Sequence, residues 1–149
     1  MNREGHVGFT LTVLSSTFYA LNLASWSYLW LALLSAFFST LPDLDLRVGA
    51  GHRRCTHSVF TAALAAAAVG LLTQHLGLGF TLGFASCMAG LLCHIAGDLL
   101  THTSFPPLWP LSRRRVSLKL FRSDSKAANA TLLALGILSS ILLAHKAAA

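Results

Sequence analysis

The fold is decided by CTHSVFTAALAAAAVGLLTQHLGLGFTLGFASCMAGLLCHIAG at residues 55–97, which contains no Asp, Glu, Lys or Arg in 43 positions. Two further uncharged stretches cover residues 5–42 and 127–145. A bilayer core needs about 20 helical residues to cross it, and lipid offers no partners to an unpaired backbone. The three stretches therefore predict about five membrane-spanning helices in one all-α, polytopic, membrane-embedded domain covering residues 1–149.

The composition of the 149-residue chain excludes several other classes of protein. Its residues are 54% hydrophobic and 11% charged, whereas an ordinary soluble domain is about 25% charged. A disordered segment, a coiled coil and an ordinary cytosolic enzyme domain are all disfavoured by this scarcity of charge. A very apolar soluble helical bundle is the remaining alternative.

Polar breaks at residues 22–27 and 73–79 divide the two longer stretches into pairs of helices. Trp26, Tyr28 and Trp30 follow the first break, where an aromatic belt at the membrane interface is expected. Two of the predicted helices are short for full spans, which allows for tilt or partial immersion. The expected helices are approximately residues 7–23, 27–41, 58–72, 80–100 and 128–144.

Basic residues gather on one side of this predicted topology. Five spans place the N-terminus and the loops 42–57 and 101–127 on one side of the membrane. Lys146 is the only basic residue on the opposite side. This asymmetry predicts an inner-membrane protein whose N-terminus and charged loops are cytoplasmic. It also explains the net charge of +6 without a nucleic-acid partner, and residues 113–115 could contact anionic lipid headgroups. The ten basic residues on the predicted cytoplasmic side are Arg3, Arg47, Arg53, Arg54, Arg113, Arg114, Arg115, Lys119, Arg122 and Lys126.

Imidazoles and carboxylates collect at the same predicted depth. His94 and Asp98 are four residues apart and share one helical face. Helix ends distant in sequence present further groups on the same side of the membrane. An ionisable residue within a membrane helix is a functional candidate by default, and a bound cation would offset its cost. The predicted metal ligands are His6, Asp43, Asp45, His57, His94 and Asp98.

Mixed imidazole and carboxylate ligation favours Zn over Ca or Mg, with Mn or Fe as alternatives. The candidate groups outnumber the four ligands of a tetrahedral zinc ion. Either some of them hold the ligands in place, or two ions lie side by side, as in many phosphoester hydrolases. His52 and Asp45 are candidates for proton transfer in catalysis. Arg53, Arg54 and Thr101 are candidates for binding an anionic substrate, because arginine offers a bidentate fork to phosphate. For the two arginines, the alternatives are ordinary positive-inside residues or partners of Asp43 and Asp45.

Five sequence blocks carry a family resemblance. Residues 4–6 (EGH), 41–45 (LPDLD), 51–58 (GHRRCTHS), 94–101 (HIAGDLLT) and 107–110 (PLWP) resemble the YdjM-like family of LexA-regulated, membrane-bound, metal-dependent hydrolases. The resemblance spans roughly residues 4–126. It implies a helical membrane protein with a His/Asp metal site, a relation to the zinc phospholipase C and single-strand nuclease fold, and a phosphoester substrate.

The chain departs from the family pattern near its last helix, where many relatives carry a Glu. Asp124 and Asn129 occupy that region here, and His102 replaces a residue of a Pro-x-Gly motif. His102 or Asp124 is a candidate substitute for the Glu. The predicted function is a metal-dependent hydrolase acting on a phospholipid or a lipid-linked phosphate. The alternatives are a metal-ion carrier and a catalytically silent membrane scaffold with a structural metal.

Overall fold

The computed structural model describes residues 1–43 and 56–149. Within them the chain forms five α-helices and no strand, with two isolated β-bridges in the segment between the last two helices. The prediction of an all-helical fold with about five helices is thereby confirmed. The helices are α1 (Arg3–Ala20), α2 (Trp26–Phe38), α3 (Val59–His75), α4 (Phe80–Leu99) and α5 (Lys126–Ala148).

Local sequence explains where several helices begin. The side chain of Asn2 accepts a hydrogen bond from the backbone N–H of Gly5 and caps α1, which therefore starts earlier than the expected residue 7. Ser58 and Ser125 cap α3 and α5 in the same manner. Such caps satisfy donors that a helix start leaves unpaired. α2 ends at Phe38, before the expected residue 41, and a short 3₁₀ turn over residues 41–43 follows it.

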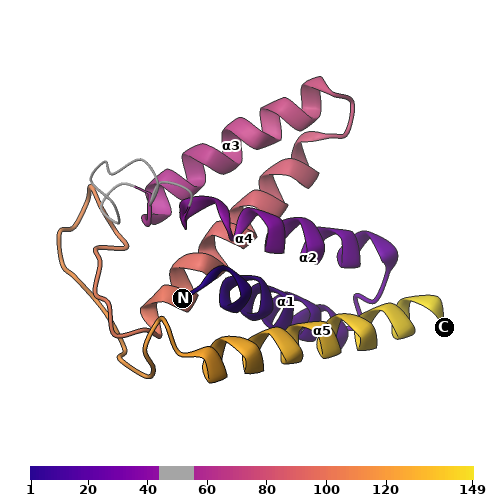
Figure 1. The fold of residues 1–149 in the computed structure, drawn as a ribbon. Coiled ribbons are helices and arrows are strands. Elements are labelled where there is room, and N and C mark those ends of the chain that lie inside the picture. The colour runs from indigo at the N-terminus through magenta and orange to yellow at the C-terminus, as the bar shows by residue number, and fades with distance from the viewer. Residues whose placement is uncertain (44–55) are drawn as a thin grey trace.

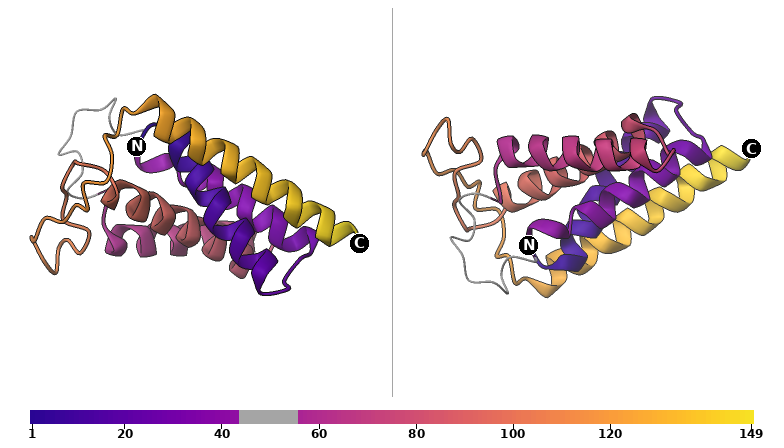
Figure 2. Two further views of the ribbon diagram at one scale, coloured as in Figure 1. Left: turned by 90° about the horizontal axis from the view of Figure 1, so that it is seen from below. Right: turned by 90° about the horizontal axis from the view of Figure 1, so that it is seen from above.

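α4 contacts α1, α2 and α3, whereas α5 packs against α1 and α2 (Figure 1). α3 and α4 form an antiparallel hairpin, whereas α1 and α5 run side by side in the same direction (Figure 2). Two glycines allow α1 and α5 to approach closely, because a Cβ on Gly136 would lie 2.5 Å from the carbonyl oxygen of Gly8. At the far end of this pair, Lys146 donates hydrogen bonds to the Tyr19 carbonyl and to Asn22 Oδ1.

Glycines at seven-residue spacing let the other helices approach α4. A Cβ on Gly83 would lie 2.2 Å from Thr73 Oγ1 of α3, and a Cβ on Gly90 would lie 2.2 Å from the Ser35 carbonyl oxygen of α2. Close approach through small residues is typical of helices that pack within a membrane. The packing brings the C-terminal end of α4 next to the start of α1 and the end of α2.

Two helices, α4 and α5, are long and apolar enough to cross a membrane. α2 has 13 residues and α3 has 17, fewer than the roughly 20 that a perpendicular span requires. α1 begins with Arg3 and Glu4. Of the about five membrane helices expected, two therefore have the length and composition of a full span, and α2 and α3 are short, as their predicted ranges indicated. Large apolar side chains of α5 are exposed, as expected of a lipid-facing surface: Leu135, Ile137, Leu138, Ile141 and Leu142.

Candidate metal centre

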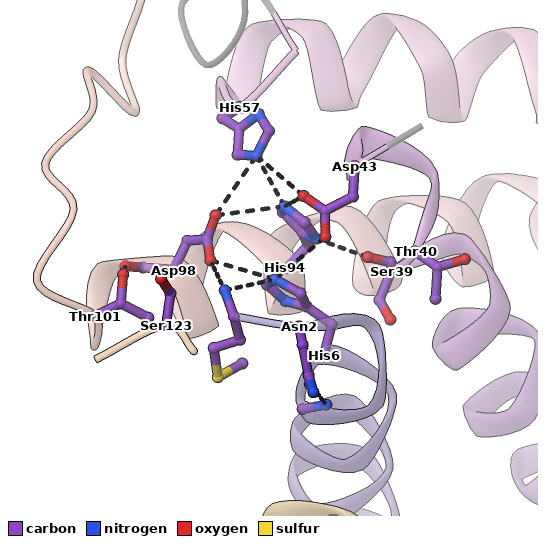
Figure 3. A network of polar contacts seen from close by, with 12 residues as sticks. Asn2, His6, Ser39, Thr40, Asp43, His57, His94, Asp98, Thr101 and Ser123 are labelled. Carbon is purple, nitrogen blue, oxygen red and sulfur yellow. Dashed lines mark hydrogen bonds and ion pairs between the residues drawn. The ribbon is translucent and has the colours of Figure 1, made fainter. Parts of the chain in front are cut away.

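Five predicted metal ligands meet where four parts of the chain converge (Figure 3). His6 lies near the start of α1, and Asp43 lies in the turn after α2. His57 immediately precedes the N-cap of α3. His94 and Asp98 occupy the last turns of α4 on one face, as their spacing predicted. The cluster therefore depends on the packing of all four segments.

The carboxylate of Asp98 lies between the three imidazoles. Its Oδ1 is 3.2 Å from His6 Nε2. Its Oδ2 is 3.5 Å from His57 Nε2 and 3.6 Å from His94 Nε2. Asp43 repeats this division: its Oδ2 is 3.7 Å from His6 Nε2, and its Oδ1 is 3.9 Å from Nε2 of both other histidines. Each carboxylate thus directs one oxygen toward His6 and the other toward the pair His57 and His94.

All three histidines direct Nε2 toward the centre of the cluster. His94 Nδ1 lies 2.7 Å from the Ser39 carbonyl oxygen, which can only accept, so this nitrogen carries the proton. His57 Nδ1 is 2.9 Å from Thr56 Oγ1. The His6 and His94 rings stack with centroids 3.8 Å apart. These contacts hold the rings so that their Nε2 atoms face the carboxylates.

The cluster is buried within the described part of the protein. The three imidazoles are fully buried, and Asp98 is 5% exposed. The side chain of Asp43 is 21% exposed. Burying charged and polar groups is costly unless they are paired or coordinate a metal. Burial of two carboxylates in one place therefore favours a compensating cation, and beside Asp98 the α-amino group of Met1 takes that place.

The spacing of the cluster fits a metal ion. Two triads, His6/His94/Asp98 and Asp43/His57/His94, each have ligand atoms within 4.8 Å of one another. Ligands about 2.0–2.1 Å from a tetrahedral zinc ion lie about 3.3 Å apart. The Nε2-to-oxygen distances of 3.2 to 3.9 Å differ little from this value. The donor set of imidazoles and carboxylates also matches zinc, manganese or iron.

Sequence reasoning missed two contacts at the centre. The Ser39 carbonyl that orients His94 is a backbone group, and no residue type marks it in a sequence. The α-amino group of Met1 contacts His6 Nε2 at 3.0 Å and forms a short ion pair with Asp98 Oδ1. Both contacts depend on helix packing, which residue patterns alone do not define.

Four predicted site residues, Asp45, His52, Arg53 and Arg54, lie outside the described residues. Thr101 is buried, and its hydroxyl donates to the Asp98 carbonyl oxygen, so this hydroxyl stabilises the α4 end rather than facing the Nε2 atoms.

The substitutes considered for the family's Glu lie away from the metal cluster. His102 is exposed. Asp124 is exposed and ion-paired with Arg122, whose hydrogen bonds hold the pKa of the Asp124 carboxyl below its usual value. Asn129 is buried, and its amide donates to the carbonyl oxygens of Ser123 and Ser125. Among the described residues, none of these side chains contacts the cluster of His6, Asp43, His57, His94 and Asp98.

Comparison with known proteins identifies a family for the whole chain. The family described as YdjM inner membrane protein matches residues 1–148. No curated protein and no solved structure matches the chain. The expected relation to the zinc phospholipase C fold receives no support from these comparisons. An inner-membrane location agrees with the two helices, α4 and α5, that can span a bilayer.

Proposed function

The chain belongs to the YdjM inner membrane protein family, and we propose that it is a membrane-bound, metal-dependent hydrolase of phosphoesters. The substrate class that we propose is a phospholipid or a lipid-linked phosphate, because the candidate centre is part of a membrane protein. The observation that carries this proposal is the meeting of three imidazole Nε2 atoms with two carboxylates in a buried cluster.

The orientation of His94 supports a cation in this cluster. Because His94 Nδ1 donates to the Ser39 carbonyl, the neutral ring directs an Nε2 lone pair inward. That atom is 3.0 Å from His57 Nε2, a hydrogen-bond distance, so the Nε2–H of His57 donates to this lone pair when no metal ion is bound. A metal ion would take the place of this proton, with both nitrogens and the neighbouring carboxylates as its ligands.

Each carboxylate directs one oxygen toward His6 and the other toward His57 and His94, and this arrangement supports a centre for one or two ions. An ion beside His57 and His94 would have Asp43 Oδ1 and Asp98 Oδ2 as oxygen ligands. A second ion beside His6 would use the opposite oxygen of each carboxylate. The α-amino group of Met1 contacts His6 Nε2 and Asp98 Oδ1 at this second position, so an ion there would have to displace it. Zinc suits both positions, with manganese or iron as alternatives.

A metal ion in this centre would lower the pKa of bound water to about 7 and stabilise charge on a phosphoester. His52 and Asp45 remain our candidates for proton transfer. Arg53 and Arg54 remain candidates for holding the phosphate, in which role a guanidinium forms two parallel hydrogen bonds. Thr101 would act indirectly in substrate binding. Its hydroxyl donates to the Asp98 carbonyl oxygen and so fixes the last turn of α4.

We also propose a multi-pass topology with the N-terminus and the metal centre on the cytoplasmic side. The support is the sequence asymmetry of ten basic residues against Lys146. The candidate metal centre lies at the C-terminal end of α4, where the basic segment that joins α4 to α5 begins (Figure 1). Labelling of single cysteines in intact spheroplasts, one placed at residue 113 and one at the C-terminal end of α5, tests this orientation. We expect the cysteine at residue 113 to be protected from the reagent and the cysteine at the end of α5 to be labelled.

A second candidate function, a silent scaffold with a structural metal, is favoured by Asn129. This residue lies in the region where many relatives carry a Glu, and its amide nitrogen donates to the carbonyl oxygens of Ser123 and Ser125 before α5. The scaffold would bind metal without hydrolysing any phosphoester. An ion carrier is disfavoured because transport sites usually lie near the bilayer midplane, whereas this cluster lies at the end of α4.

A lipid-hydrolysis screen on detergent-purified protein tests the proposed function. We expect phosphoester cleavage that a chelator abolishes and that added zinc or manganese restores. His57→Ala and Asp98→Ala should lose both metal and turnover. His102→Ala is the matched control, because it removes an exposed imidazole that lies outside the cluster. Turnover that persists in both cluster variants at full metal content would refute the ligand assignment, and bound metal without any turnover would favour the scaffold.

A further inference from the structure

Residues 108–122, which we call the 108–122 segment, combine exposed apolar and exposed basic side chains. The segment follows α4 and precedes α5. Leu111 is 87% exposed and Leu120 is 67% exposed, although neither belongs to a helix. The exposed apolar residues of the segment are Leu108, Leu111, Val116, Leu118 and Leu120. The exposed basic residues are Arg113, Arg114, Arg115, Lys119 and Arg122.

The segment is held against the end of α4 by backbone hydrogen bonds. The N–H of Leu118 donates to the Leu99 carbonyl at 2.7 Å, and the N–H of Leu120 donates to the Leu100 carbonyl at 2.9 Å. Val116 forms an antiparallel bridge with Phe105. The apolar and basic side chains are therefore displayed from a fixed backbone at the end of the helices that carries the metal centre (Figures 1 and 2).

The location of the segment places it at a membrane surface. The segment joins the end of α4 to the start of α5, and these are the two helices that can cross a bilayer. Two consecutive spans joined by one segment have their joined ends at the same face of the membrane. The segment therefore begins and ends at one face of the membrane.

The charge of the segment selects an anionic surface. Arg122 is paired with Asp124 at 3.0 Å, and Arg115 donates to the Ser104 carbonyl. The side chains of Arg113, Arg114 and Lys119 have no hydrogen bond or ion pair among the described residues. Basic side chains interleaved with apolar ones fit a leaflet in which anionic headgroups overlie hydrocarbon.

We propose that the 108–122 segment docks on anionic phospholipid headgroups beside the metal centre. Leu111, Leu118 and Leu120 enter the boundary of the acyl chains, while Arg113, Arg114 and Lys119 bind headgroup phosphates. This docking does not depend on the proposed hydrolysis, because it requires only the membrane-embedded helices and the segment itself. It would concentrate anionic lipids next to the candidate metal centre.

Trp109 provides a probe within the segment. The chain has three tryptophans, so Trp26→Phe with Trp30→Phe leaves Trp109 as the sole tryptophan, whose emission can be excited selectively at long wavelengths where tyrosine does not absorb. The full-length protein is reconstituted in phosphatidylcholine nanodiscs with or without about 30% phosphatidylglycerol. Brominated lipids then report how deeply Trp109 lies. We expect a blue-shifted emission and stronger quenching in the anionic discs, and both effects should weaken as the salt concentration rises.

Charge variants separate lipid docking from a structural role of the side chains. Each basic residue near an anionic surface favours binding roughly fivefold, so Arg113→Gln, Arg114→Gln and Lys119→Gln together should lower the docked-to-undocked ratio about a hundredfold. Exchanging arginine and lysine at the same three positions keeps the charge and should preserve docking. The metal content of each variant shows that the fold is retained.

Several results would overturn the proposal. Equal quenching of Trp109 in neutral and anionic discs would show that the lipid charge is not recognised. Full docking of the triple glutamine variant would show that these three cations do not bind headgroups. Loss of docking in the arginine–lysine exchange variant would indicate a site for one specific partner instead of an anionic surface. Loss of hydrolysis with docking unchanged would contradict the proposed function alone.

Discussion

The Gly90→Ala substitution links helix packing to the metal centre. A Cβ at Gly90 would lie 2.2 Å from the Ser35 carbonyl oxygen and 2.9 Å from Phe38 Cβ, although ordinary contacts begin at 3.4 Å. Because Ser35 contributes backbone atoms to this contact, no side-chain rotation can relieve it. α2 and α4 must therefore separate by about 1 Å at this point, and overpacking of this kind costs about 1–3 kcal/mol of unfolding free energy.

The separation of α2 and α4 also moves apart two groups at the candidate metal centre, one near the end of each helix. Ser39 follows Ser35 by one turn, and His94 follows Gly90 by one turn. The hydrogen bond from His94 Nδ1 to the Ser39 carbonyl is 2.7 Å long, and an added 1 Å exceeds the usual hydrogen-bond range. Loss of a contact that orients a ligand lowers metal affinity by about tenfold to a hundredfold.

Competition between the purified protein and a zinc chelator measures this affinity, and thermal unfolding measures stability in the same detergent. Gly83→Ala is the matched control. Its Cβ would meet Thr73 Oγ1 at 2.2 Å, so it overpacks α4 against α3 and leaves the bond between His94 and Ser39 intact. We expect both variants to lose stability and only Gly90→Ala to lose affinity. Equal affinities in the two variants would refute the role of the Ser39 carbonyl.

Two further substitutions test other parts of the structure. Asp124→Asn should leave the metal content unchanged, because the carboxyl is exposed and its pKa is lowered first by the hydrogen bonds and then by the charge of Arg122. A metal-free variant by elemental analysis would place Asp124 at the centre after all. Gly136→Ala should lower the unfolding free energy by about 1–3 kcal/mol, because its Cβ would lie 2.5 Å from the Gly8 carbonyl oxygen. An unchanged melting temperature would contradict the close packing of α1 and α5.

The helices could be predicted because their signals are local. Long uncharged stretches indicated apolar helices, and the polar breaks indicated where they turn. Span number was harder to predict, because 38 uncharged residues at 5–42 contain two helices of which α2 has only 13 residues. Absence of charge shows that a segment tolerates lipid, but it does not show that each helix is long enough to cross.

The candidate centre was predictable to the extent that its residues lie at helix ends. The spacing of His94 and Asp98 follows from helical geometry, and the shared depth of His6, Asp43 and His57 followed from topology. The division of carboxylate oxygens between His6 and the other two histidines required the packing angles of four segments. The parallel pairing of α1 with α5 was equally out of reach, because Gly8 and Gly136 mark close approach only once their partners are known.

The most direct test of the account is the metal content of the protein purified in detergent. Elemental analysis should find one or two equivalents of zinc, manganese or iron in the wild-type protein. Asp98→Ala should lose the metal, because both oxygens of Asp98 lie among the three imidazoles, whereas His102→Ala should retain it. A wild-type protein that neither contains metal nor binds added zinc, manganese or iron would contradict the account.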